Sequence, residues 1–532
     1  MTRCGGTLLQ IHYHNRPGGV ATVLSGYARA FGMSCPAPLP FANILVCSAP
    51  QALRDNRYDG RIIDVGDCEY RSFRTRPSFA AARSRLLRKL VSVINDSSLP
   101  RPVMVVGHNL NLGKNCALSS AFAGLARQYT RSSQDVRFFS VVHDFAEQGR
   151  TDLLDGIRTV RRFNAAIEGD LYPQTDNLSF VAPSGQTRDI LKKAGFPVML
   201  VPNPAMHRNA PEVHGKEVRT RLRVAMLEIA KQEKVRLRPL RPVLLYPSRV
   251  IARKNPVEAV LVSHVMLRSN LLLGATGASS GDKRLSAGLK RLCRKHGIPV
   301  LFDAGRIAKK VFTHENCFQS LYECADLCVS TSLAEGYGYA IHECAQWGKN
   351  LIGRAPRGVW DDEAQMHGSL YCRLLVPIDW VDTALLKKTY YRRLKGTRTW
   401  AGAWAGIESF SMMFDAAFTK DNGIDFGCLD AQTQLCILER CITSSGDARA
   451  WKQAFSQQTA QLLSSFESAT ARRLPGPELT EDNGFSGAFC RYFCRNGVSR
   501  RGRVGGDAGA IRRHFSALRD FPLLMSSRAI VP

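Results

Sequence analysis

The sequence contains no apolar run of the roughly 18 residues that a membrane-spanning helix needs. Near its N-terminus it has only a short apolar stretch, 8–12, without a small-residue cleavage site, so a secretory signal peptide is not expected. We therefore expect a cytoplasmic protein. A chain of 532 residues is too long for one ordinary hydrophobic core, and at least two domains are predicted.

Cysteine pairs with the spacing of a zinc site are also missing. The chain has 16 cysteines, yet none of them forms a Cys-x2-Cys pair. Cys324 with Cys328, and Cys490 with Cys494, are four apart and have no matching Cys/His pair nearby. No metal site is therefore predicted. In a chain without a secretory signal, we expect most of these cysteines to be buried and reduced.

Acidic residues are scarce. The sequence has 45 Asp and Glu against 73 Lys and Arg, which gives a formal net charge of +28 at pH 7. Such an excess fits a protein that handles phosphates, nucleic acid or an anionic membrane. No recognition helix, zinc finger or RNA-binding aromatic pair accompanies the charge, so specific nucleic-acid binding is not expected. The densest basic segment, 491–519, is interpreted as a solvated tail.

The hydrophobic pattern alternates short apolar runs with amphipathic stretches, which indicates parallel sheets covered by helices on both faces. Helical patterns at 20–31 and 81–94 separate the first strand candidates, which lie at 8–14, 44–48, 103–106, 138–143, 180–182 and 198–201. The same rhythm then returns with strand candidates at 243–246, 271–273, 299–302, 327–330 and 350–353. The predicted fold class is therefore α/β, with two doubly wound, Rossmann-like lobes facing a central cleft.

The domain organisation follows from this rhythm and from shifts in composition. We predict an N-terminal lobe over 1–204, a charged connection with one helix over 205–241 and a C-terminal lobe over 242–378. A helical extension over 379–470 and a basic, partly irregular tail over 471–532 follow.

The strongest local signal for function is a turn between the strand at 327–330 and a helical pattern that carries Glu343. The turn consists of Glu335, Gly336, Tyr337 and Gly338. A turn that opens a helix offers backbone N–H groups and a positive dipole end to a diphosphate. The two carboxylates would lie on the order of 10 Å apart, a distance that suits hydroxyls on two sugar rings of one ligand. The alternative is that both are ordinary helix acids.

A basic loop opens the second lobe. Arg249 and Lys254 follow the strand at 243–246, so they belong to the carboxyl edge of the sheet, where sheets of this kind bind ligands. Two cations at that edge can neutralise a departing diphosphate without a metal ion. Arginine supplies a bidentate fork and lysine a point charge.

Weaker signals lie in the first lobe. Gly18 and Gly19 separate the first strand from a helix and can let a loop close over phosphates or an acceptor, although a Gly-Gly pair suits any turn. His143 ends a strand and is either a ligand contact or a hydrogen-bonded structural residue. The segment from Gly107 to Asn115 has one residue too many for a P-loop and Asn where Ser or Thr binds magnesium, which excludes an NTPase.

Taken in chain order, the Gly-Gly loop, the strand-end histidine, the Arg/Lys loop and the Glu-x7-Glu block resemble the retaining glycosyltransferases of family 4. That family has the GT-B architecture, and the resemblance covers roughly 8–355. It implies that Arg249 and Lys254 hold the donor diphosphate and that Glu335 contacts the transferred sugar. Backbone contacts are implied for Gly336, Tyr337 and Gly338, ribose binding for Glu343, a place near the donor sugar for His143, and one near phosphate and acceptor for Gly18 and Gly19.

The resemblance also implies a reaction. A hexose would pass from a nucleotide-diphosphate sugar to an acceptor hydroxyl with retention of configuration, without a metal or a cofactor. Family members show no evident protein nucleophile, and the leaving phosphate is thought to assist the acceptor hydroxyl on the same face. The donor base, the sugar, the acceptor and the oligomeric state are not predicted.

The sequence departs from the family pattern after Glu343. The usual small-residue run ending in Gly-x-Pro is replaced, and the loop 356–362 has one glycine where many members have two. The helical block after Asp379 is also larger than usual. An atypical branch is therefore predicted, and one candidate is a branch that makes soluble glycosides of the glucosylglycerate type.

Two other functions stay open. One is a sugar-nucleotide epimerase or phosphorylase of the same fold, and the other is a catalytically silent protein that binds glycans or membrane. The basic stretch 82–90 is either a helix in peripheral contact with the anionic inner membrane face or a helix packed on its own lobe, which we favour.

Overall fold

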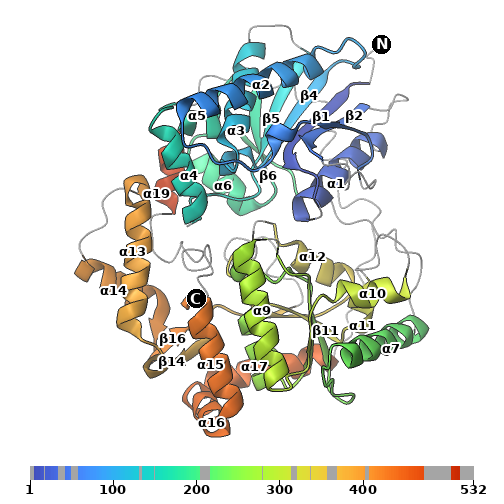
Figure 1. The fold of residues 1–532 in the computed structure, drawn as a ribbon, viewed down its shortest axis with the longest axis vertical. Coiled ribbons are helices and arrows are strands. Elements are labelled where there is room, and N and C mark those ends of the chain that lie inside the picture. The colour runs from blue at the N-terminus through green and yellow to red at the C-terminus, as the bar shows by residue number, and fades with distance from the viewer. Residues whose placement is uncertain are drawn as a thin grey trace. The chain divides into compact units, whose positions relative to one another are not determined.

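The computed structural model of the protein describes residues 5–16, 18–33, 42–49, 58–130, 135–148, 150–203, 216–277, 279–312, 320–335, 337–355, 368–401, 407–471 and 505–515 (Figure 1). The chain divides into two compact units. One contains Met1–Met206 and Leu479–Ser516, and the other contains His207–Glu478 and Ala517–Pro532.

The first unit is built on a seven-stranded parallel sheet with the order β3-β2-β1-β4-β5-β6-β7. Its strands are β1 (Thr7–His14), β2 (Ala42–Ser48), β3 (Arg61–Asp64), β4 (Val103–His108), β5 (Val136–Val141), β6 (Leu178–Ala182) and β7 (Val198–Leu200). Strand β3 was not predicted, because its four residues are exposed or half-buried and give no apolar run.

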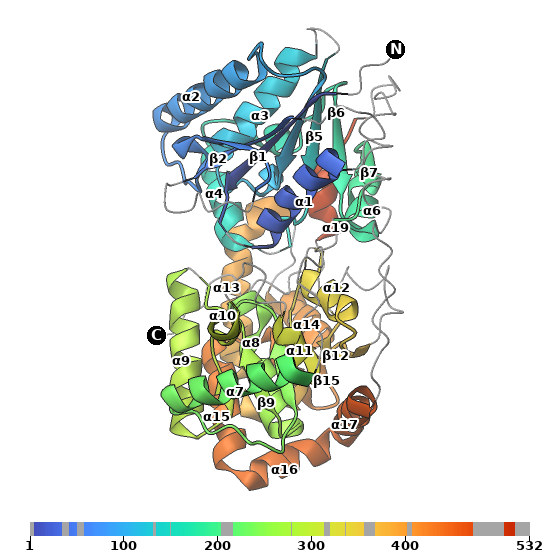
Figure 2. The same cartoon turned by 90° about the vertical axis from the view of Figure 1, so that its right-hand side faces the viewer.

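Helices connect these strands in order: α1 (Gly19–Met33), α2 (Arg76–Ile94), α3 (Cys116–Tyr129), α4 (Thr151–Arg161), α5 (Ile167–Leu171) and α6 (Gly185–Lys193). The β1-to-β2 and β3-to-β4 connections cross the sheet in opposite directions. Right-handed crossovers therefore place α1 and α2 on opposite faces, with β1 between them in Figure 2. Helix α2 buries Ala82, Leu86 and Leu90, so the apolar positions of 82–90 pack within the unit, as we favoured.

The C-terminal helix α19 (Ala508–His514) belongs to the first unit. Ile511 and Phe515 are buried there, and the Asp507 amide donates to the Ala194 carbonyl at 2.8 Å, beside α6. Arg512 forms an ion pair with Glu168 of α5. The interpretation of 491–519 as a solvated tail is therefore wrong for 505–515, where two apolar side chains supply an anchor that the arginine-rich composition concealed.

The second unit has a six-stranded parallel sheet with the order β10-β9-β8-β11-β12-β13. Its strands are β8 (Val243–Tyr246), β9 (Asn270–Leu273), β10 (Val300–Leu301), β11 (Leu327–Ser330), β12 (Leu351–Arg354) and β13 (Gly368–Tyr371). Leu244 and Tyr246 pack into one core, and Val243 and Leu245 pack into another. Successive side chains of a strand point to opposite faces, so a sheet buried on both faces requires continuously apolar strands.

Each core of the second unit has its own helices. One contains residues of α7 (Lys216–Gln232), α10 (Gly305–Val311), α11 (Ser320–Cys324) and α12 (Tyr339–Gln346). The other contains residues of α8 (Pro256–Val260), α9 (Ser280–Lys295), α13 (Thr383–Ala401), α14 (Ile407–Phe418), α15 (Ala431–Thr443), α16 (Ser445–Ala454) and α17 (Ser456–Ala471). The helix expected in the connection is thus α7, and it packs on the second sheet.

The extension after 379 is not purely helical. Strand β14 (Leu375–Pro377) pairs antiparallel with β16 (Gly423–Asp425), which also pairs with β15 (Thr419–Lys420). These strands are too short to leave a recognisable alternating pattern. The predicted fold class, two doubly wound α/β lobes with parallel sheets, is confirmed. No helix in the described ranges combines the length and apolarity needed to span a membrane.

Candidate active site

Two loops meet at the carboxyl edge of the second sheet. One follows β8 and contains the short 3-10 turn η4 (Ala252–Lys254), and the other follows β11 and leads into α12. Strands β8 and β11 are parallel neighbours, so both loops leave the same edge. The Leu333 amide donates to the Arg253 carbonyl at 3.0 Å, and Thr331 Oγ1 donates to the Asn255 carbonyl at 2.7 Å. The two loops are therefore hydrogen-bonded to each other.

Lys254 and Glu335 form an ion pair at the centre of these loops. Their side chains are only 12% and 8% exposed. Burial raises the pKa of Glu335, but the charges of Lys254 and Arg253 outweigh burial, and the net result is a pKa below the ordinary value. Glu335 is therefore a carboxylate at neutral pH, held next to a cation in a nearly dry environment where electrostatic interactions are strong.

The cations of the loop after β8 occupy different places. Lys254 reaches Glu335, whereas Arg249 lies at the start of the loop with an exposed side chain. Arg253, which the sequence reasoning passed over, donates from Nη1 to the Ala334 carbonyl at 3.3 Å. Its position next to Lys254 in a basic loop was the signal that could have identified it.

The turn before α12 has the geometry expected of a helix start. Gly338 has a φ of +81°, which favours glycine, and its carbonyl accepts hydrogen bonds from the amides of Ile341 and His342 at 2.8 and 3.2 Å. The Tyr337 ring stacks on His342, with 4.2 Å between the ring centres. Burial lowers the pKa of His342 to about 4, so this ring is neutral at pH 7. Gly336 lies outside the described residues.

Glu343 lies in a different environment from Glu335. Tyr322 of α11 donates its hydroxyl to Glu343 Oε2 at 2.6 Å. Burial raises the pKa of Glu343 to about 7, against the opposing effect of this hydrogen bond. The Glu343 carboxyl is therefore much more easily protonated than an ordinary glutamate. Nothing in the sequence around Tyr322 indicated this contact.

A buried ionic cluster supports the loop after β8. Asn255 has a left-handed φ of +54° and donates from Nδ2 to Glu258 Oε2 at 2.6 Å. Arg354 Nε lies 2.6 Å from Glu258 Oε1, and Arg354 Nη2 lies 2.5 Å from Asp425 Oδ1. Tyr371 also donates to Glu258 Oε1, at 2.7 Å. Because Asp425 ends β16, the extension after 379 contributes to the support of Lys254.

The predicted residues of the first unit lie at the carboxyl edge of its sheet. His143 follows β5, and its amide donates to Asn109 Oδ1 at 2.9 Å. Its ring lies parallel to the His108 ring, with 3.4 Å between His108 Nδ1 and His143 Nε2. Burial lowers the pKa of His143 to about 4. These contacts are those of a hydrogen-bonded structural residue, and a role at the donor sugar stays a prediction.

Gly18 and Gly19 are exposed at the start of α1, where the Gly18 carbonyl accepts a hydrogen bond from the Thr22 amide at 3.1 Å. The segment from Gly107 to Asn115 is built differently from a P-loop. It contains two left-handed residues, Asn109 and Gly113, and Asn115 caps α3 with its side chain. In the parts of the chain that the structure describes, no cluster of three or more His, Cys, Asp or Glu side chains is placed to hold a metal ion.

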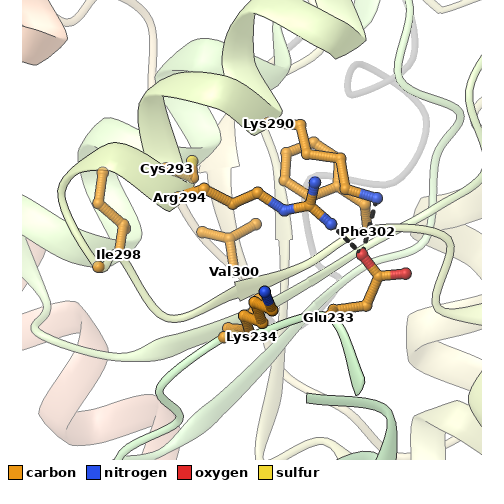
Figure 3. A pocket seen from close by; sticks show the side chains of 10 residues that line it. Glu233, Lys234, Lys290, Cys293, Arg294, Ile298, Val300 and Phe302 are labelled. Atoms are coloured by element: carbon orange, nitrogen blue, oxygen red, sulfur yellow. Dashed lines mark hydrogen bonds and ion pairs between the residues drawn. The ribbon is translucent and has the colours of Figure 1, made fainter. Parts of the chain in front are cut away.

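A surface hollow in the second unit lies away from all of these residues. It is shallow and open to solvent, and it is lined by Glu233, Lys234, Val235, Lys290, Cys293, Arg294, Gly297, Ile298, Val300 and Phe302. Figure 3 shows that Lys290 and Arg294 point toward Glu233. Lys290 Nζ lies 2.9 Å and Arg294 Nη2 lies 2.5 Å from Glu233 Oε2. Hydrogen bonds from Lys290 and Arg306 lower the pKa of Glu233 to about 2.

The position of this hollow argues against a donor site. Glu233, Lys234 and Val235 precede β8, and Gly297 and Ile298 precede β10, so most of the lining lies toward the amino edge of the sheet, with Val300 in β10 and Phe302 directly after it. Ligands of doubly wound sheets bind at the carboxyl edge, which is where Lys254 and Glu335 lie. We therefore interpret the ion cluster at Glu233 as structural.

Comparison with models of known protein families gives no match. A mannosylglucosyl-3-phosphoglycerate synthase from Petrotoga mobilis is 25% identical over 291 residues, which are 54% of this chain and 53% of that protein. The chain thus spans about half the length of the curated relative that it matches.

Solved structures with a similar course of the chain include a sucrose-phosphate synthase from Thermosynechococcus elongatus, with a TM-score of 0.44 and 14% identity over 87% of this chain and 100% of that chain. The catalytic domain of starch synthase IV from Arabidopsis thaliana gives a TM-score of 0.47 and 11% identity over 88% of this chain and 100% of that chain. Similarity at this level says nothing of substrates.

Proposed function

We propose that the protein is a glycosyltransferase that moves a hexose from a nucleotide-diphosphate sugar to an acceptor hydroxyl, with retention of configuration and without a metal ion. The observation that carries the proposal is the nearly buried Lys254–Glu335 ion pair at the carboxyl edge of the second sheet. A fixed cation and a fixed carboxylate side by side suit a ligand with an anionic diphosphate joined to a polyhydroxylated sugar.

Each charged group has a chemical task in this proposal. Lys254, with Arg249 and Arg253 on the same loop, offsets the charge that develops on the leaving diphosphate. The Glu335 carboxylate accepts hydrogen bonds from hydroxyls of the transferred sugar, and ionised Glu343 accepts them from the ribose. A developing charge is stabilised best by groups that are already oriented, which the hydrogen bonds between the two loops provide.

The proposed reaction balances without a protein nucleophile. The bond between the anomeric carbon and the diphosphate oxygen breaks, and the bond from the acceptor oxygen to the same carbon forms on the same face. The proton of the acceptor hydroxyl passes to the departing diphosphate. The cations of the loop after β8 make the diphosphate a better leaving group because they lower the free energy of its charged form.

The relative from Petrotoga mobilis supports glycosyl transfer, because its name describes the synthesis of a sugar-bearing 3-phosphoglycerate. Support for family 4, and with it for retention, comes from the order of the sequence motifs. The placement of Lys254 next to Glu335 supports binding of a diphosphate sugar, and this support does not depend on the resemblance.

The test is a donor screen on the full chain. UDP-glucose, GDP-mannose and their ADP counterparts are incubated with candidate acceptors, in buffer with and without EDTA, and products are identified by mass spectrometry. We expect free nucleotide diphosphate only when an acceptor is present, unchanged turnover with EDTA, and an α-linked product from an α-linked donor by NMR. A β-linked product would exclude retention.

The alternatives predict other results. An epimerase would change the donor sugar without an acceptor and without releasing nucleotide. A phosphorylase would require phosphate. If none of the donors is consumed and no nucleotide diphosphate raises the unfolding temperature, the result contradicts the proposal and favours a silent binding module.

A further inference from the structure

A cationic and aromatic cluster lies at the carboxyl end of β1, in the first unit. We call His14, Arg16, Glu69, Tyr70 and Lys114 the β1-end cluster. His14 ends β1, Tyr70 follows the 3-10 turn η2 (Gly66–Cys68), and Lys114 precedes α3. Three segments that are distant in sequence thus contribute to one place at the edge where doubly wound sheets bind ligands.

The side chains of the cluster are in direct contact. The Tyr70 and His14 rings lie edge to face, 4.8 Å apart between centres. Lys114 Nζ donates to the Tyr70 hydroxyl at 3.0 Å and lies 4.5 Å from the ring centre. The Arg16 amide donates to His14 Nδ1 at 3.2 Å, and the Arg16 guanidinium pairs with Glu69 at 2.5 Å. The cluster therefore holds two permanent cations and one carboxylate.

The charge of the cluster is accessible from solvent. The Arg16 side chain is 46% exposed, and Tyr70 is one of the few large hydrophobic residues exposed among those described, at 41%. A partly exposed aromatic residue beside cations suits a ligand that has both a sugar ring and an anionic group. Aromatic rings stack on the apolar faces of sugars, and arginine and lysine side chains in general bind phosphate or carboxylate oxygens.

The neighbouring histidines do not add positive charge. Burial lowers the pKa of His14 to about 4, and the charges of Arg16 and Lys114 act in the same direction, opposed by Glu69. Burial lowers the pKa of His12 to about 3, with His14, Lys114 and His143 contributing. The surroundings thus resist a further proton, whereas an incoming anion would reduce the repulsion between the cations.

We propose that the β1-end cluster binds the anionic group of the acceptor, so that the acceptor is a phosphorylated or carboxylated hydroxy compound. This inference rests on the proposed glycosyltransferase function and names its acceptor class. Arg16 exchanges Glu69 for the ligand's anion, Lys114 contributes the second cation, and Tyr70 covers the adjoining ring or carbon chain. Glu69 competes with the ligand for Arg16, which gives the proposal a distinctive signature.

Binding is tested first without any donor. 3-Phosphoglycerate, glycerate and inorganic phosphate are titrated separately into the full-length protein, and the ring signals of His14 are followed by NMR over pH 3–8. Binding of 3-phosphoglycerate should raise the pKa of His14, because the anion offsets Arg16 and Lys114. Lys114→Met and Arg16→Gln should each weaken binding about tenfold or more, since each removes a charge-assisted contact. Glu69→Gln should tighten it severalfold.

Lys192→Met is the matched control, because Lys192 is an exposed lysine of α6 in the same unit. It should bind 3-phosphoglycerate as the wild type does. Arg16 and Glu69 are partly exposed, so their variants test the proposal even if Lys114→Met folds poorly. No shift of His14 with any probe, or equal weakening by Lys192→Met, overturns the proposal.

A separate experiment distinguishes a lipid headgroup from a soluble anion as the ligand of the β1-end cluster. Vesicles with and without phosphatidylglycerol are sedimented with wild type and Lys114→Met. Lys114-dependent vesicle binding without binding of a soluble anion would assign the cluster to a lipid headgroup and contradict a soluble acceptor. Inorganic phosphate binding as tightly as 3-phosphoglycerate would show an adventitious ion only and would also overturn the proposal.

Activity separates this inference from the function on which it rests. With an anionic acceptor, Lys114→Met should raise KM for the acceptor about tenfold or more while donor affinity stays unchanged. If the protein transfers sugar to neutral acceptors and Lys114→Met does not change KM for them, the proposed subsite is refuted, whereas the proposed glycosyltransferase function is not. Binding of 3-phosphoglycerate without any sugar transfer would refute the transferase and leave the subsite.

Discussion

The Lys254–Glu335 pair of the second unit and the β1-end cluster of the first unit carry charge in opposite ways. In the second unit, Lys254 is paired with Glu335 in a nearly dry environment. The next residue, Asn255, is hydrogen-bonded to Glu258 of a second buried ion pair, that of Glu258 with Arg354. At the carboxyl end of β1 in the first unit, buried His12 is neutral and the permanent charge of Arg16 lies toward solvent. Beyond β5, neutral His143 adjoins Asp144, whose ion pair with Arg150 is only 17% and 13% exposed. Paired, buried charges are oriented before a ligand arrives, whereas partly exposed cations can change partners.

This difference suits two kinds of substrate contact. A leaving diphosphate gains most from charges that need no reorientation. An acceptor must bind and dissociate in every reaction cycle, and partly exposed cations, whose charge the solvent screens, can bind it with the moderate affinity that this requires. Variants on both sides can test the comparison.

The largest effect is expected from the Lys254–Glu335 pair. Lys254→Met and Glu335→Gln should each lower kcat by about 100-fold or more, because each removes charge at the diphosphate or the sugar. Each variant also leaves a buried partner charge unpaired, which lowers the free energy of unfolding by about 3–5 kcal/mol. Steady-state kinetics and urea unfolding measure the two effects.

The double variant Lys254→Met/Glu335→Gln separates these effects. It removes both charges, so its stability should recover while its activity does not. Lys310→Ala is the control, because Lys310 pairs with Glu228 on the exposed surface of the same unit. A double variant that turns over the donor at the wild-type rate would show that the pair has a structural role only.

The second effect concerns the buried cluster beneath the loop. Arg354→Met leaves the carboxylates of Glu258 and Asp425 without their cation and should lower the free energy of unfolding by about 3–5 kcal/mol. Adding Glu258→Gln should recover part of that loss. If the cluster positions Lys254, the folded double variant should bind nucleotide diphosphate more weakly, as calorimetry would show. Unchanged affinity would mean that the cluster stabilises the fold alone.

Much of this architecture, but little of this charge pairing, follows from the sequence. Continuous apolar runs identified the buried strands, and the glycine-punctuated turn before α12 was placed correctly because turn residues act locally. The ion-pair partner of Glu258 lies far along the chain, because Arg354 is 96 residues away from Glu258 in the sequence. Tyr322, which donates to Glu343, likewise lies on another helix. Only the fold brings such residues together, and no spacing rule indicates them.

The third effect is a pH dependence specific to the second unit. Burial raises the pKa of Glu343 to about 7, so its ionised fraction grows as the pH rises from 6 to 8. If only the carboxylate binds ribose hydroxyls, nucleotide affinity should increase about tenfold over this range. Glu343→Gln should remove the dependence, and exposed Glu228→Gln should preserve it. A wild-type affinity that is flat between pH 6 and 8 would contradict this role of Glu343.

The first unit should respond differently over the same range. The pKa values of His12, His14 and His143 lie near 3–4, so these rings stay neutral between pH 6 and 8. Binding of 3-phosphoglycerate to Lys114 and Arg16 should therefore vary little, beyond the ionisation of the ligand itself. Titrations of both ligands on one preparation, with carboxylate-only glycerate as a second probe, compare the two edges directly.

The smallest effect is expected at the docked C-terminal helix. Arg512 pairs with Glu168 and acts on buried Glu147, whose pKa burial raises to about 7 against the opposing effects of the Tyr172 hydrogen bond and Arg512. A carboxyl whose pKa is higher in the folded than in the unfolded protein contributes stability that is fully present below the pKa of the unfolded state. That contribution is lost as the pH rises through the folded-state pKa of about 7. Arg512→Gln should raise the pKa of Glu147 further, measurable by carbon NMR of that carboxyl.

The same variant should lower the free energy of unfolding by roughly 1 kcal/mol at pH 8, because it removes one partly exposed ion pair and makes ionised Glu147 costlier. At pH 6 the loss should be smaller, since more of Glu147 is then protonated. Arg158→Gln, which removes an exposed pair with Asp155, serves as the control and should show no such pH dependence. Equal losses at both pH values would mean that Arg512 acts only through Glu168.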